Sequence, residues 1–174
     1  MRLCEARRVC RGWWHDCSAA ILLIGASVCV LPGAFVRLFS GSPYGYGMMV
    51  SFGHLVPPVW LMSLGWTVWY ALLGATFAAS LWYAARRSCV VRAEVYRAGM
   101  LFLSMILIGL WWYPCFFVAC DVLLATLIVL IVLTLCVLCA IAFWHTLRTA
   151  SAVLIAHAVW LAWLAGVSVR ILFF

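Results

Sequence analysis

Residues 57–74 read PPVWLMSLGWTVWYALLG, and no charged residue interrupts the apolar sequence from there to Ala85. Proline is favoured in the first turn of a helix, because its missing N–H would have no helical partner there in any case. A helix over residues 57–85 is long enough to cross the hydrocarbon of a bilayer, which takes about 20 residues. The stretch therefore predicts a transmembrane helix that begins at Pro57-Pro58 and ends before Arg86-Arg87.

The composition of the whole chain extends this prediction. Of the 174 residues, 70% are hydrophobic and 9% are charged, whereas soluble domains average roughly 45–50% apolar and about 25% charged residues. Such a chain has too few polar groups to cover a globular surface in water, so a lipid bilayer is its natural solvent. The formal net charge is +7, but the arginines lie between apolar stretches, where they set topology. Nucleic acid is therefore not expected as a partner.

Four more apolar stretches have the length of a membrane span. The expected helices cover about residues 18–39, 57–85, 98–117, 122–144 and 149–173. Pro114 lies in the last turn of the third helix and is expected to kink it, and Asp121 is expected to cap the start of the fourth. Residues 1–17 form a basic arm ahead of this 18–174 domain. The predicted fold class is an all-α membrane protein, a bundle of five transmembrane helices.

The distribution of arginine tests the number of spans. With the N-terminus on the non-translocated side, the segments on that side carry Arg2, Arg7, Arg8, Arg11, Arg86, Arg87, Arg92, Arg97 and Arg148. The translocated side carries only Arg37 and Arg170. Basic residues mark the non-translocated side of a membrane protein, so the alternation favours five spans in this orientation.

Cysteines and small residues inside the spans have structural interpretations. Cys136 and Cys139 form a Cys-x-x-Cys within a run of Leu, Val and Ile. No further polar ligand is near them in the sequence, so we expect packing instead of a metal or redox site. Small residues recur at helical spacing in two stripes, Ala71-Ala75-Ala79 and Ala158-Ala162-Gly166. Such stripes let helices approach closely in lipid, either within the bundle, which we favour, or across a homodimer.

The 57–74 stretch also carries a family resemblance. Pro57-Pro58-Val59-Trp60, then Gly65 to Tyr70 (GWTVWY), then Gly74 resemble the P-P-x-W, V-W-T-x-L-Y and M-G pattern of the TspO/MBR family at the same spacing. This family is also called translocator protein, peripheral benzodiazepine receptor or tryptophan-rich sensory protein. Residues 112–117 (WYPCFF) are similar to its W-S-x-x-F-F. The resemblance runs from about Ser18 to Leu172 and implies a five-helix bundle with an internal pocket for porphyrins, haem or sterols.

Several polar positions of the family pattern are changed in this chain. Met105 and Gly109 stand where the family has Gln and Asn, and Ala156-His157 where it has Pro-Tyr. The loop before the double proline reads FGHL over residues 52–55, in place of Lys-Pro-x-Trp. The chain is therefore identified as a divergent member of the family. The resemblance supports the predicted architecture more strongly than the predicted ligand.

The resemblance implies which residues bind a ligand. The expected ligand-binding residues are Trp66, Trp160, Trp163, His54, His157 and Trp60. The sequence pattern alone leaves open that the tryptophans are core or interfacial belt residues. His157 or His54 would be the contact to haem iron, although His157 could instead hydrogen-bond a buried carbonyl. No metal and no required cofactor is expected beyond a porphyrin or haem ligand.

The predicted function is that of a membrane receptor or transporter for a tetrapyrrole or sterol. The alternatives are a light-dependent porphyrin-degrading enzyme and a membrane scaffold that has lost ligand binding. The acidic residues Glu5, Asp16, Glu94 and Asp121 lie outside the spans or at their edges, so hydrolytic or phosphoryl-transfer chemistry is not expected. The resemblance implies a multi-pass protein of the mitochondrial outer membrane in a eukaryote, or of a host membrane for a viral copy.

Overall fold

The chain folds into a bundle of long helices. The computed structural model describes residues 19–39 and 59–173. These residues form α2 (Ala19–Phe39), α4 (Val59–Ala85), α5 (Cys89–Leu110), the π-helical segment η2 (Pro114–Val118), α6 (Val122–Trp144) and α7 (Arg148–Phe173). Five spans in this part of the chain are long and apolar enough to cross a membrane, with α5 and η2 forming one of them. The prediction of an all-α membrane protein with five transmembrane helices is confirmed.

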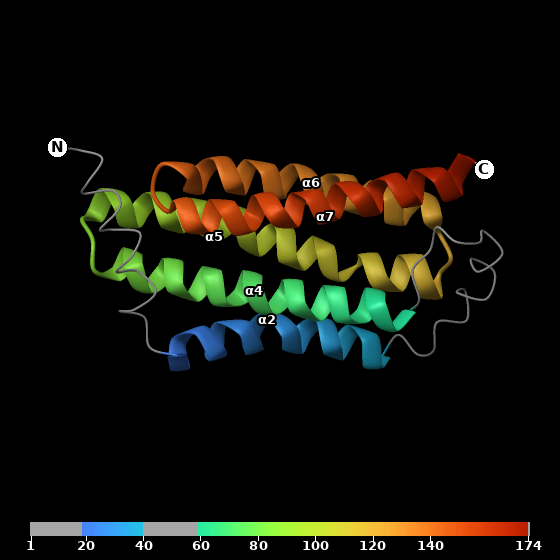
Figure 1. Ribbon diagram of the computed structural model, residues 1–174, viewed down its shortest axis with the longest axis horizontal. Coiled ribbons are helices and arrows are strands. Elements are labelled where there is room, and N and C mark those ends of the chain that lie inside the picture. Colours follow the sequence, from blue (N-terminus) through green and yellow to red (C-terminus); the bar gives the residue numbers. More distant parts are fainter. Residues whose placement is uncertain (1–18, 40–58, 174) are drawn as a thin grey trace.

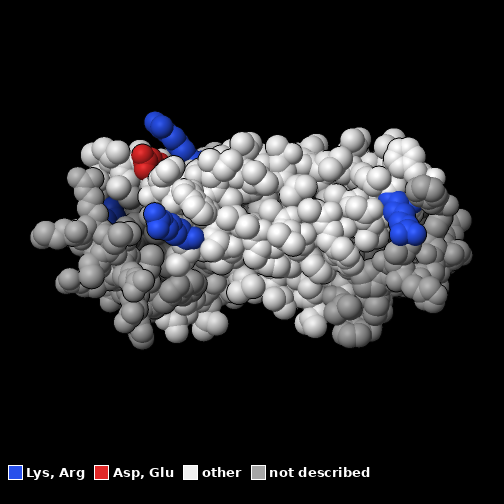
Figure 2. All heavy atoms as spheres, turned by 45° about the horizontal axis from the view of Figure 1, so that its top comes forward, with Lys and Arg blue, Asp and Glu red and all other residues white. Residues whose placement is uncertain are grey.

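The helices lie nearly parallel to the long axis of the molecule (Figure 1). The most extensive contacts join α2 to α4 and α6 to α7, and α5 packs between these pairs against α6 and α4. α2 is peripheral, because it packs mainly on α4 and contacts α5 only lightly. The charged side chains on the face shown in Figure 2 gather at the two ends of the bundle and leave an uncharged middle, which suits a protein surrounded by lipid.

α5 begins at Cys89, so the prediction that this helix starts near Ala98 is wrong. Its first turns are amphipathic. Val95 and Ala98 are buried, whereas Arg92 and Arg97 are exposed. The apolar run visible in the sequence begins only where both sides of the helix become apolar, although the helical backbone extends further.

The break expected at Pro114 takes the form of the π-helical segment η2. Proline has no N–H and disrupts the regular helical hydrogen bonds around it, and here the N–H of Ala119 donates to the Pro114 carbonyl at 2.9 Å. Cys120 then adopts a left-handed backbone with φ of 54°. The Asp121 carboxylate accepts a hydrogen bond from the Leu124 N–H at 2.9 Å, which confirms Asp121 as the N-cap of α6.

Glycine permits a close contact between α2 and α4. Gly25 of α2 and Gly74 of α4 lie directly against each other, and both are buried. A Cβ on Gly74 would lie 2.8 Å from the Gly25 carbonyl carbon and 2.9 Å from the Cys29 Cβ. The α2–α4 pair therefore depends on the absence of a side chain at both glycines.

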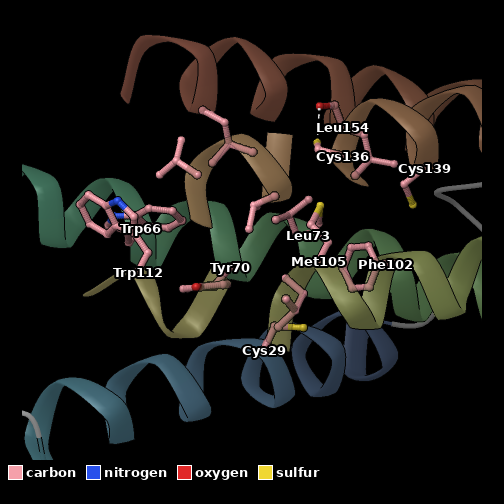
Figure 3. Packing of buried hydrophobic residues seen from close by; sticks show 14 of the residues in the cluster. Cys29, Trp66, Tyr70, Leu73, Phe102, Met105, Trp112, Cys136, Cys139 and Leu154 are labelled. Atoms are coloured by element: carbon pink, nitrogen blue, oxygen red, sulfur yellow. Dashed lines mark hydrogen bonds between the residues drawn. The ribbon is translucent and has the colours of Figure 1, made fainter. Parts of the chain in front are cut away.

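Short polar contacts tie α6 to its neighbours. The Ser151 hydroxyl of α7 donates to the Ala140 carbonyl of α6 at 2.8 Å. The Cys136 thiol donates to the Leu154 carbonyl at 3.2 Å, and the Cys139 thiol to the Ala98 carbonyl at 3.5 Å. Both cysteines are buried. Figure 3 shows them among the buried hydrophobic residues, with the hydrogen bond from Cys136 to Leu154 as a dashed line. The burial of both side chains is what packing requires, and the two thiols also make hydrogen bonds between helices.

The two stripes of small residues differ in their surroundings. In α4, Ala79 is buried and Ala71 and Ala75 are partly buried, as expected for a contact within the bundle. In α7, Ala162 and Gly166 are exposed, and no atom of another residue would lie within 4 Å of a Cβ on Gly166. The preferred intramolecular interpretation of the α7 stripe is therefore wrong at these two positions.

Candidate functional site

A cavity of about 750 Å³ lies between α2, α4, α5 and η2, in the half of the bundle where α2 ends and α4 begins. Ligand pockets have volumes of about 300–1,000 Å³, so it has the size of a small-molecule site. Its lining consists of Val30, Gly33, Ala34, Val36, Arg37, Leu38, Met62, Ser63, Trp66, Thr67, Tyr70, Gly109, Leu110, Trp112, Tyr113 and Phe117.

Aromatic rings from two helical segments form a continuous wall. The Trp66 ring centroid lies 5.6 Å from that of Tyr70 and 5.3 Å from that of Trp112. Trp112 in turn stacks on Phe116, which is buried and does not line the cavity, with 4.9 Å between ring centroids. Figure 3 shows Trp66 and Trp112 beside each other and Tyr70 further along α4. Residues 62, 66 and 70 are spaced four apart and share one side of the helix, which explains why Met62, Trp66 and Tyr70 all line the cavity.

Two ring N–H groups in this wall lack hydrogen-bond partners. The Nε1 atoms of Trp66 and Trp112 are fully buried and contact no acceptor among the described residues. A buried donor without a partner costs about 1–3 kcal/mol. Because protein atoms enclose both Nε1 atoms, a ligand in the cavity would contact the indole rings and not these N–H groups.

α7 contributes a separate group of rings on another side of α4. His157 is only 2% exposed, and its ring centroid lies 5.0 Å from Trp69 and 6.4 Å from Trp66. Trp160 lies against Gly65, because a Cβ on that glycine would be 2.9 Å from the indole. Trp163 packs on Trp160 with 5.0 Å between ring centroids and is 42% exposed.

The structure thus divides the expected ligand-binding residues. Trp66 lines the cavity, whereas Trp160, Trp163 and His157 belong to the α7 group and do not line it. His54 and the side chain of Trp60 lie outside the described residues. The His157 Nδ1 has no partner among the described residues, and haem ligation by either histidine stays a prediction.

Several cavity residues were absent from the expected set. Trp112, Tyr113 and Phe117 line the cavity and belong to residues 112–117 (WYPCFF). This stretch is part of the family resemblance, but none of its residues was among the predicted ligand-binding residues. Tyr70 lies one helical turn after Trp66. Two features of the sequence could have predicted these residues. Tyr70 follows Trp66 at a spacing that puts both on one side of a helix, and aromatic residues are concentrated around Pro114.

Comparison with known proteins identifies a relationship over nearly the whole chain. The family model described as TspO/MBR family matches residues 20–174. Neither the curated proteins nor the solved structures contain a significant match to this chain.

Proposed function

The chain belongs to the TspO/MBR family, and from this premise we propose that it binds a flat polycyclic ligand, a tetrapyrrole or a sterol, in the cavity between α2, α4 and α5. The observation that carries the proposal is the wall of Trp66, Tyr70 and Trp112 along a cavity of about 750 Å³. Aromatic faces bind flat apolar ligands by stacking, with large buried areas. The protein would act as a receptor or carrier for such a molecule within the membrane.

The polar groups of the cavity support a ligand that is mainly apolar but carries a few acceptors. The hydroxyl groups of Ser63, Tyr70 and Tyr113 line the cavity and can donate or accept hydrogen bonds. Ligand sites commonly combine an apolar lining with a small number of such polar groups.

Titration of the purified protein with protoporphyrin IX in detergent micelles tests the proposal. We expect saturable quenching of tryptophan fluorescence, together with a shift of the porphyrin absorption band. Trp112→Phe should weaken binding roughly three- to tenfold, because the larger indole ring is lost from the wall. The absorption band is the primary readout for this variant, since the substitution itself changes the fluorescence.

Trp111→Phe is the matched control. Trp111 adjoins Trp112 in sequence but is 67% exposed, whereas Trp112 is 2% exposed, and Trp111 does not line the cavity. Its substitution should leave the affinity unchanged. Absence of saturable binding of both protoporphyrin IX and cholesterol to the unsubstituted protein would refute the proposal. Equal losses in the Trp111 and Trp112 variants would refute the choice of cavity. Illumination of the complex, followed by analysis of the porphyrin, would separate a binder from a porphyrin-degrading enzyme.

A further inference from the structure

Arg37 gives the cavity a positive charge. It lies in the last turn of α2 and is half-buried in the cavity wall. Apart from the indoles, the other polar side chains described along this wall belong to Ser63, Thr67, Tyr70 and Tyr113 and carry neutral hydroxyl groups. The charge therefore stands at one end of a mainly apolar cavity.

No described carboxylate neutralises this charge. The Arg37 guanidinium lies 5.7 Å from the centroid of the Tyr113 ring, a cation–π contact that engages one face of the group. Of the described acids, Asp121 caps α6 by accepting from the Leu124 N–H, and Glu94 lies in the first turns of α5, at the opposite end of that span. Guanidinium donors lie in the plane of the group, so contact with the ring leaves them free to bind an anion.

We infer that Arg37 binds a carboxylate of the ligand while the ligand's ring system lies against Trp66 and Trp112. This inference rests on the proposed function and narrows it to a polycyclic acid, such as a tetrapyrrole with acidic side chains. Arginine binds carboxylates through paired, charge-assisted hydrogen bonds, and a cavity of low polarity strengthens that attraction. A sterol has a single uncharged hydroxyl and cannot use this contact. The competing role for Arg37 is to extend its side chain to lipid headgroups at the membrane edge.

The test compares protoporphyrin IX with its dimethyl ester, which has the same ring but no carboxylates. The unsubstituted protein should bind the acid about tenfold more tightly than the ester, as expected for one charge-assisted contact. Arg37→Gln should lower the affinity for the acid about tenfold and leave that for the ester unchanged. Retained ester binding also shows that the variant is folded.

Arg170→Gln is the matched control, because Arg170 also lies in the last turn of a span, is exposed, and does not line this cavity. It should change neither affinity. Equal binding of acid and ester by the unsubstituted protein would overturn the inference but leave the proposed function standing. A preference for the acid that survives Arg37→Gln, or is lost equally in Arg170→Gln, would also overturn it. Failure of both porphyrins and cholesterol to bind would instead overturn the proposed function itself.

Discussion

Gly74→Ala should separate α2 from α4. The added Cβ would lie 2.8 Å from the Gly25 carbonyl carbon, 2.9 Å from the Cys29 Cβ, and against the Gly25 carbonyl oxygen. Carbon atoms prefer separations of about 3.5–4.0 Å, so the helices must part by about 1 Å. Two of these neighbours are backbone atoms, and a change of side-chain rotamer cannot move them aside.

The expected cost follows from two opposing effects. Forcing an extra carbon into a packed contact destabilises by about 1–3 kcal/mol. Alanine is favoured over glycine in a helix by about 0.5–1 kcal/mol. The net loss should therefore be about 1–2 kcal/mol. It is measured as the shift in the midpoint of unfolding when sodium dodecyl sulfate is added to the protein in mild detergent micelles, followed by tryptophan fluorescence.

Gly166→Ala provides the matched control for this substitution. It is the same replacement within a membrane-spanning helix, but nothing lies within 4 Å of its added Cβ. We expect stability equal to or slightly above that of the unsubstituted protein. Because α2 forms one wall of the cavity, Gly74→Ala should also weaken porphyrin binding, whereas Gly166→Ala should not. Equal unfolding midpoints for the two variants would refute the close α2–α4 contact.

Two further substitution sets test the ends of the helices. Asp121→Ala should lower stability in the same detergent assay by about 0.5–2 kcal/mol, because it removes the cap on α6. Asp121→Asn keeps a side-chain oxygen and should retain most of the stability. Equal losses in the two variants would contradict capping by that oxygen. In variants that lack Cys4, Cys10 and Cys17 of the N-terminal arm and keep either Cys89, the first residue of α5, or Cys120, after η2, as the exposed cysteine of the described residues, a membrane-impermeant maleimide should label Cys89 from the non-translocated side and Cys120 from the translocated side. Labelling in the reverse pattern would show that the orientation inferred from arginine is wrong.

The sequence predicted helices best where their ends carry local signals. The predicted span of α6, residues 122–144, agrees with Val122–Trp144 in the structure, because Asp121 caps one end and the whole segment is apolar. α5 was predicted to begin too late, because its amphipathic first turns resemble a charged loop in a hydropathy profile. Pro114 predicted a break, but whether the chain would kink or form a π-helical turn depends on which carbonyls can find new donors.

The candidate site was harder to predict, because α4 is apolar on every side. Trp66 and Trp69 both belong to the family-like signature, yet Trp66 lines the cavity and Trp69 lies against His157 of α7. In a soluble helix, polar residues would mark the side facing away from the core. Around a membrane helix the lipid is as apolar as the protein core. The periodicity of hydrophobic residues therefore could not show which neighbouring helix each tryptophan of α4 faces. Only the packing of α2 and α7 on different sides of α4 decides it.

The same packing explains how the departures from the family pattern bear on the ligand. Gly109, which stands where the family has Asn, lines the cavity, and a Cβ there would lie 3.7 Å from the Tyr70 hydroxyl. An amide side chain at this position would supply a donor and an acceptor inside the cavity, and glycine supplies neither. Along the described wall, directional polar recognition of the proposed ligand therefore falls to hydroxyl groups and to the charge of Arg37. Because a guanidinium can only donate hydrogen bonds, the proposed ligand would gain most by placing a carboxylate at Arg37.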